Sequence, residues 1–142
     1  FIIAGQDTDG SMTPEDLGMQ WCVGYDKAFS WIGQRALTRE DTRKTARKQL
    51  VGLRPLNPKV IPQEGAQIIA SNDRTIPVPM LGHVTSSYYS PSLDSGIALA
   101  VVHNGHQRMG ETIWLTGSDG EIHQAEIVST VFIDPKGERQ NA

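Results

Sequence analysis

The sequence predicts a mainly β protein, with a short α+β lead-in over residues 1–44 followed by a small antiparallel β domain, a barrel or a sandwich, over residues 45–142. Three observations support this prediction. Apolar runs of strand length recur at short intervals after the first third of the chain, turn-forming pairs separate them, and helical spacing is confined to the lead-in. Many short strands with regularly spaced turns are typical of antiparallel barrels and sandwiches.

The lead-in begins with an apolar run over residues 1–4, which predicts a strand. Because this run starts without a Met, we expect the chain to begin inside a larger protein. Residues 5–11 are rich in Asp and Gly and predict a turn. Thr13 can cap a helix and Pro14 suits the first helical position, so a short helix is expected to follow.

The remainder of the lead-in predicts one strand and one helix. The apolar run at residues 21–23 predicts a brief strand. Phe29, Ile32 and Leu37 recur at helical spacing, which predicts a helix over residues 28–37.

Six strand-like runs follow the lead-in. They are KQLVGLRP, AQIIAS, TIPVPMLGHVTSS, GIALAVV, ETIWLT and HQAEIVSTVFI. Asn104-Gly105 and Asp119-Gly120 are dipeptides favoured in β-hairpins, so a hairpin is expected at each.

A polar, aromatic stretch stands directly before one of these runs. Thr85 to Pro91 is rich in hydroxyl groups and carries Tyr88 and Tyr89, whereas residues 97–102 are apolar. We expect Thr85 to Pro91 to be a loop, either an ordinary connection between strands or the lining of a site, and the apolar run to be a buried strand. Ser and Thr commonly bridge the backbone of loops, which favours the ordinary connection.

Charge and composition exclude several classes of protein. The net charge of −3 disfavours a nucleic-acid partner. No apolar run reaches the roughly 18 residues needed to span a membrane, so no membrane partner is expected. The single cysteine, Cys22, excludes an internal disulfide and a cysteine-based zinc site. It suits a reducing compartment, so a cytoplasmic protein is expected, and Cys22 itself is expected to be a small buried residue.

No catalytic set stands out from the residues. Asp7, Asp9 and Gly10 resemble the start of a calcium-binding loop, but the twelfth position is Gly18, which lacks the required carboxylate. Cations cluster between residues 35 and 48. This cluster is interpreted as a solvated linker rather than a phosphate or polyglutamate patch, since charge runs are usually exposed. Its members are Arg35, Arg39, Arg43, Lys44, Arg47 and Lys48.

Three stretches in order resemble the aminomethyltransferase family, which includes the glycine-cleavage T-protein. They are GQDTDGSMTPEDLGMQWCV, then FSWIGQRAL with KQLVGLRP, then GHVTSSYYSPSLDSGIALAVV. The resemblance implies that residues 1–44 are the C-terminal end of a folate-binding domain and that residues 45–142 are a C-terminal antiparallel β-barrel. It also implies that the loop from Thr85 to Pro91 packs toward the folate domain.

Within that family, GQDTDG with TPEDLGMQW and the ending FIDPKGER are most similar to the alpha subunits of heterotetrameric sarcosine oxidases. Such an oxidase demethylates sarcosine to glycine and hydrogen peroxide, and tetrahydrofolate captures the released one-carbon unit. The resemblance implies that FAD, FMN and NAD are bound by other parts of the complex. It also implies the upstream part of the alpha subunit and the other subunits as partners, and an inactive isolated chain.

The resemblance implies that this chain contributes only the outer wall of a folate site. The candidate cofactor-binding residues are Asp7, Trp21 and Tyr88, with no catalytic residue and no metal ligand. Two alternatives stay open, the C-terminal part of a free aminomethyltransferase and a barrel that serves only assembly. All three hypotheses predict an exposed apolar face along residues 1–4 and 21–32.

Overall fold

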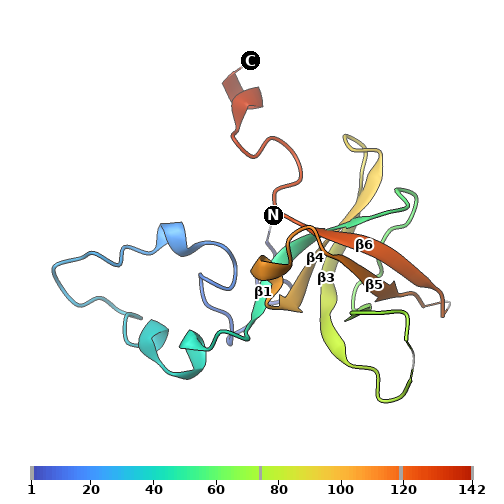
Figure 1. Cartoon of the computed structure of the whole chain (residues 1–142). Coiled ribbons are helices and arrows are strands. Elements are labelled where there is room, and N and C mark those ends of the chain that lie inside the picture. Colours follow the sequence, from blue (N-terminus) through green and yellow to red (C-terminus); the bar gives the residue numbers. More distant parts are fainter. Residues whose placement is uncertain (1, 74, 119, 142) are drawn as a thin grey trace.

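The structure, a computed structural model, describes residues 2–73, 75–118 and 120–141. A closed antiparallel barrel with the strand order β1-β4-β3-β2-β5-β6 dominates it (Figure 1). The strands are β1 (Lys48–Pro55), β2 (Gln67–Ile69), β3 (Met80–Ser90), β4 (Ser95–His103), β5 (Thr112–Thr116) and β6 (Ile122–Val128). Each of the six predicted runs forms one strand. The choice between barrel and sandwich is resolved because β1 pairs with both β4 and β6.

Strand alternation places one set of apolar side chains inside the barrel. Val51 and Leu53 of β1 face inward, and the other strands add further interior residues, all buried. On β4, Ala98, Ala100 and Val102 point inward while Leu99 and Val101 point outward. Both faces of β4 are therefore buried, which explains why its sequence is a continuous apolar run.

Residues 2–17 cover part of the outer face of the barrel. Ile2, Met12 and Leu17 pack on a second apolar cluster formed by Leu50, Leu99 and Val101. Phe132, which follows β6, joins the same cluster. The lead-in is therefore attached to the barrel at its beginning.

The predicted helices of the lead-in are wrong. Residues 14–18 form only a turn, and Gly18 ends it with a φ of +68°. Residues 28–37 form bends and turns that lead into a short 3₁₀ helix, η2 (Ala36–Thr38). Phe29 and Ile32 are 68% and 102% exposed, so the apolar spacing finds no surface to pack on. Tertiary burial supplies most of the stability of a helix, and here it is absent.

Two predicted strands of the lead-in are also wrong. Residues 2–4 form no strand, apart from a single bridge from Ala4 to Thr8, and Phe1 lies outside the described residues. Trp21 and Cys22 belong to the 3₁₀ helix η1 (Gln20–Cys22). Cys22, expected to be buried, is exposed.

The polar stretch from Thr85 is strand rather than loop. Residues 85–90 continue β3, and the tight turn at residues 91–94 joins it to β4. The pairing of β3 with β4 shifts between Val84 and Ser86, so Thr85 forms a β-bulge. Thr85 and Ser86 are buried although they are polar, and Tyr88 and Tyr89 are exposed although they are aromatic. The strand therefore lacks the alternation of apolar and polar residues that would have predicted it, and the sequence suggested a loop.

The two hairpin dipeptides have different outcomes. β5 and β6 pair across residues 117–121, where the second hairpin was expected, although Asp119 itself lies outside the described residues. The first prediction is wrong, because β4 pairs with β1 and β3 rather than with β5. Asn104 has a φ of 54° and precedes the 3₁₀ helix η4 (Gly105–Arg108), which leads the chain across to β5.

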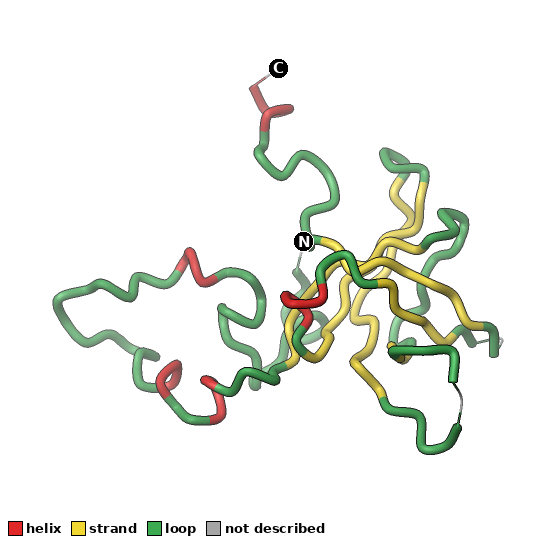
Figure 2. Tube along the Cα trace, viewed as in Figure 1, coloured by secondary structure: helices red, strands yellow, loops and turns green. Residues whose placement is uncertain are grey.

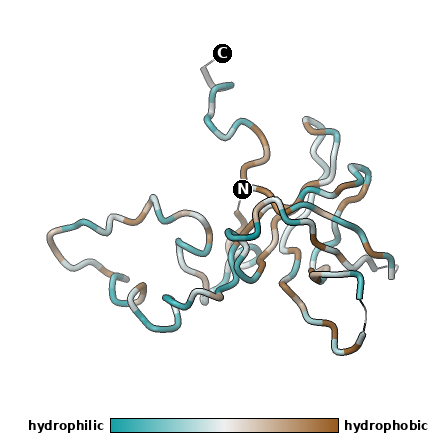
Figure 3. Tube along the Cα trace, in the orientation of Figure 1, coloured by the Kyte–Doolittle hydropathy of each residue, from teal (hydrophilic) through white to brown (hydrophobic). Residues whose placement is uncertain are grey.

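Residues 18–44 form a lobe that projects away from the barrel, here called the lead-in lobe (Figure 2). It holds η1, η2 and η3 (Asp41–Arg43), joined by loops. Hydrophobic and hydrophilic segments alternate along it (Figure 3). The tail after β6 ends in η5 (Glu138–Asn141). Among the described residues, no helix is both long and apolar enough to cross a membrane.

Candidate functional site

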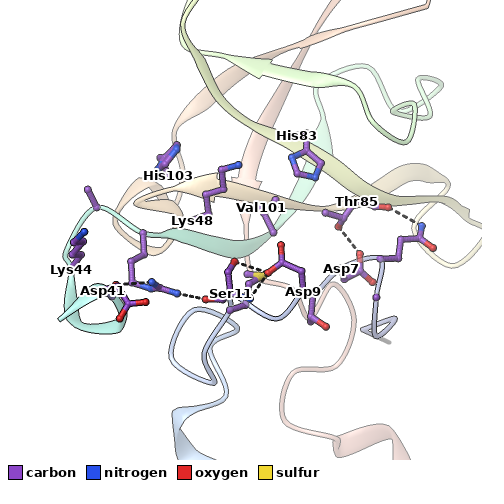
Figure 4. Close-up of a pocket in the computed structure, with 16 residues that line it drawn as sticks. Asp7, Asp9, Ser11, Asp41, Lys44, Lys48, His83, Thr85, Val101 and His103 are labelled. Atoms are coloured by element: carbon purple, nitrogen blue, oxygen red, sulfur yellow. Dashed lines mark hydrogen bonds between the residues drawn. The ribbon is translucent and has the colours of Figure 1, made fainter. Parts of the chain in front are cut away.

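An open cavity of about 550 Å³ lies between the start of the lead-in and the outer face of the barrel. One side is the turn over residues 5–9, and the other side comes from β1, β3 and β4. Figure 4 shows Lys48, His83 and His103 on the strands and Asp9 on the turn that faces them.

The turn is fixed to the barrel through the bulge at Thr85. The Asp7 carboxylate, 1% exposed, accepts a hydrogen bond of 2.5 Å from the Thr85 hydroxyl and one of 2.7 Å from the Ile3 amide. The Gln6 side chain donates to the Thr85 carbonyl over 2.8 Å. A bulge withdraws its residue from the strand ladder, and here the turn supplies the missing partner.

The barrel side of the cavity follows from strand register. Lys48 of β1 is directly opposite His103 of β4, and His83 of β3 is opposite Val101. Paired residues project to the same face, as do residues two apart on one strand. These four side chains therefore share the outer face of three adjacent strands, with Val101 as an apolar floor.

A buried ion pair closes the end of the cavity where the lead-in lobe rejoins the barrel. The Arg47 guanidinium contacts the Asp16 carboxylate at 2.6 Å and also donates to the Ser11 and Asp41 carbonyls. Burial alone would raise the pKa of Asp16, but hydrogen bonds from Arg47 and Thr13 hold it below its usual value.

Two further groups in the cavity have shifted pKa values. Burial lowers the pKa of His83, and the nearby Lys48 ammonium lowers it further, against a smaller opposing effect of Asp9. Hydrogen bonds from the Ser11 hydroxyl and amide lower the pKa of Asp9. His83 is thus disposed to stay neutral beside a lysine.

The three predicted site residues do not converge. Asp7 lines the cavity, whereas Trp21 and Tyr88 do not. Trp21 is 79% exposed on the lead-in lobe, and Tyr88 is 52% exposed on β3 near the turn into β4.

The cation cluster divides between two environments. Arg35, Arg39 and Arg43 are exposed on the lead-in lobe, as a solvated linker predicts. Lys44, Arg47 and Lys48 instead line the cavity. Neither His83 nor His103 was singled out from the sequence, and both line the cavity. The direct pairing of Lys48 with His103 depends on which strands are neighbours, and the sequence pattern does not contain that information.

The described part of the chain contains no group of three His, Cys, Asp or Glu residues placed to hold a metal ion. The cavity is lined by ammonium, guanidinium, imidazole and carboxylate groups. These groups can bind and orient a charged ligand.

Comparison with solved structures supports the fold. The crystal structure of glycine cleavage system aminomethyltransferase T from Bartonella henselae matches with a TM-score of 0.73 at 22% identity. The match covers 92% of this chain and 34% of that one.

Curated relatives fall into two groups. Sarcosine oxidase subunit alpha of Corynebacterium sp. (strain U-96) is 39% identical over 143 residues, covering 99% of this chain and 14% of the relative. The same subunit of Rhizobium meliloti (strain 1021) is 37% identical, covering 96% of this chain and 14% of the relative. Aminomethyltransferase of Thermotoga petrophila is 30% identical over 132 residues, covering 93% of this chain and 33% of the relative.

The chain thus spans about one seventh of the length of the sarcosine oxidase subunits that it matches. The family model of the glycine cleavage T-protein C-terminal barrel domain matches residues 48–134, which include all six strands of the barrel. The chain therefore belongs to the glycine cleavage T-protein C-terminal barrel domain family.

Proposed function

We propose that this chain acts as the C-terminal part of a sarcosine oxidase alpha subunit. In this role it supports the tetrahydrofolate-dependent capture of the one-carbon unit released when sarcosine is demethylated to glycine. The observation that carries the proposal is the 39% identity to a sarcosine oxidase subunit alpha over 99% of the chain. Because the relative is about seven times longer, the flavin and nicotinamide chemistry is assigned to other parts of such a complex.

A second candidate is the C-terminal part of a free aminomethyltransferase. The family match and the 30% identity to the Thermotoga petrophila enzyme favour it. A role limited to assembly is the third candidate. Dependence on a flavin-containing partner separates the first candidate from the second, and folate binding separates both from the third.

The chain's own residues fit the outer wall of a folate site rather than a complete pocket. Asp7 directs its carboxylate to Thr85 and Ile3, so its part is to hold the turn that forms the cavity wall. Trp21 and Tyr88 offer exposed aromatic faces, which suit packing against a ring system or a neighbouring domain. A folate contact by either residue needs further residues to complete the pocket.

The exposed apolar side chains of the lead-in lobe support an adjoining upstream domain as a partner. Trp21, Tyr25, Phe29 and Ile32 are between 44% and 102% exposed. Exposed apolar groups gathered on one segment are typical of an interaction surface. Most of each sarcosine oxidase relative lies outside the part that this chain matches, which leaves room for such a domain.

A chimaera tests the function. The matching segment of the Corynebacterium sp. (strain U-96) subunit alpha is replaced by this chain, and 5-formyltetrahydrofolate is titrated calorimetrically. The controls are the unmodified subunit and the subunit truncated before that segment. Trp21→Ala and Tyr88→Ala in the chimaera test the two aromatic residues separately, with Trp114→Ala as the aromatic control.

We expect the chimaera to bind the folate as the unmodified subunit does. We also expect it to keep a folate-dependent yield of methylenetetrahydrofolate from sarcosine in the assembled complex. Binding in the truncated subunit that equals binding in the chimaera would remove this chain from the folate site. Binding with no turnover in the flavin-containing complex would favour the aminomethyltransferase alternative.

A further inference from the structure

The cavity gathers one ammonium and two imidazole groups from neighbouring strands. Lys48 and His103 are directly opposite each other across β1 and β4, and His83 lies one strand further on. Within the three described segments, none of these side chains forms an ion pair, and none donates a hydrogen bond through its nitrogen atoms. Val101 lies between them, 6% exposed, and gives the cavity an apolar floor.

Three carboxylates also line the cavity, but two of them are engaged. Asp7 gives both oxygens to Thr85 and Ile3. Asp9 accepts from the Ser11 hydroxyl at 2.6 Å and from the Ser11 amide at 2.8 Å. The third, Asp41, lies on η3 at the far end of the cavity, where the lead-in lobe returns to the barrel.

We propose that this cavity binds an oxyanion, the carboxylate or phosphate group of a small molecule, between Lys48 and His103 with His83 beside it. Ammonium and imidazole donors on one rigid sheet face are suited to an oxyanion, because the strands hold their spacing. The apolar floor at Val101 and Met12 fits a carbon skeleton attached to that group. This inference does not depend on the proposed folate role.

The pKa of His83 is sensitive to charge in the cavity. Burial lowers this pKa, the Lys48 ammonium lowers it further, and the Asp9 charge opposes that effect only in part. An anion bound beside Lys48 would neutralise that field, so the His83 pKa should rise on binding. A cavity with no affinity for anions leaves the His83 pKa unchanged.

The test is calorimetric titration of the chain with citrate and, separately, with pyrophosphate, at ionic strength matched with sodium chloride. We expect one probe or both to bind more tightly than about 1 mM. Binding of citrate alone identifies a carboxylate ligand, and binding of pyrophosphate alone identifies a phosphate ligand. Two-dimensional NMR of the histidines follows the His83 pKa with and without the probe.

Variants separate a site from general charge attraction. Lys48→Gln should weaken binding about tenfold, equivalent to about 1.4 kcal/mol, whereas the exposed Lys59→Gln should leave it unchanged. Asp9→Asn should tighten binding, because it removes a negative charge and keeps the oxygen that accepts from Ser11. If neither citrate nor pyrophosphate binds at concentrations up to tenfold above about 1 mM, the proposal is overturned. Equal losses in the two lysine variants, or an unmoved His83 pKa, also overturn it.

Discussion

At the scale of single residues, Asp7 holds the first turn on the barrel. Asp7→Asn removes the charge and one acceptor from a buried group that receives hydrogen bonds from Thr85 and Ile3. We expect the free energy of unfolding to fall by about 2 kcal/mol, since hydrogen bonds to buried charged groups contribute about this much. Urea unfolding followed by tryptophan fluorescence measures the change.

The matched control for Asp7 is Asp26→Asn, an exposed aspartate with no hydrogen bond among the described residues, where the change should stay within about 0.5 kcal/mol. Equal stability of the two variants would show that the turn does not depend on Asp7. If Asp7→Asn instead leaves stability intact but abolishes folate binding in the chimaera, Asp7 contacts the ligand directly.

The Asp16–Arg47 pair makes stability depend on pH. Asp16 is almost fully buried and its folded pKa is lowered, so its contribution is present above the unfolded pKa of about 3.9 and is lost as pH falls through the folded value. Asp16→Asn should cost about 3 kcal/mol at pH 7, because it leaves Arg47 without its counter-charge. The difference between the two proteins should shrink as pH falls below about 3.9 in urea unfolding.

A surface pair provides the comparison for Asp16. Arg54 and Glu126 are 2.9 Å apart, but the Arg54 side chain is 58% exposed and water screens the pair. Glu126→Gln should therefore cost no more than about 1 kcal/mol at neutral pH. A constant gap between wild type and Asp16→Asn down to pH 3 would contradict the assignment of the pH dependence to Asp16.

At the scale of elements, β4 depends on a close approach to the loop before β2. Gly96 donates to the Pro58 carbonyl over 2.9 Å, and a Cβ at this position would lie 2.1 Å from the Val60 carbonyl oxygen. Gly96→Ala must push the loop away, which should destabilise the protein by about 2 kcal/mol. Thermal unfolding measures the loss. Gly10→Ala is the control, since nothing lies within 4 Å of its added Cβ, and an equal loss there would refute the steric argument.

The elements that were predictable from the sequence are those whose pattern is set by burial in the barrel. β1 runs from Lys48 to Pro55 as its apolar run predicts, because its side chains alternate between the interior and the covered outer face. The helix over residues 28–37 failed for the opposite reason. Its apolar side chains face solvent in this chain, and spacing alone does not say whether a packing surface exists.

The candidate site was less predictable than the fold. The family resemblance singled out Asp7, which lines the cavity, but its hydrogen bond from Thr85 depends on a bulge that no sequence signal marks. His83 and Lys48 are 35 positions apart in the chain and meet only through the pairing of both β1 and β3 with β4. Such contacts follow from topology, which periodicity does not determine.

At the scale of the whole molecule, the lead-in lobe should be more accessible to proteases than the barrel. Arg35, Arg39, Arg43 and Lys44 are exposed on the lead-in lobe, whose described backbone–backbone hydrogen bonds lie within turns and short 3₁₀ helices. Arg108, by contrast, lies on η4, between the barrel strands β4 and β5. Limited trypsin digestion should cut the lead-in lobe first, because proteases need a locally unfolded segment. Mass spectrometry of early time points identifies the cuts, and a first cut at Arg108 would contradict this.

The N-terminal piece produced by these first cuts should stay bound to the barrel. Ile2, Met12 and Leu17 pack on the apolar cluster of the outer face of the barrel. Asp16 lies in the N-terminal piece and stays paired with Arg47 when the cut is on the N-terminal side of Arg47. The nicked protein should therefore elute as one species in native size-exclusion chromatography and separate into two in urea. Asp16→Asn weakens the attachment and should release the N-terminal piece without denaturant. Loss of that piece from the nicked wild-type protein would mean that the lead-in depends on chain continuity, and not on its contacts with the outer face of the barrel.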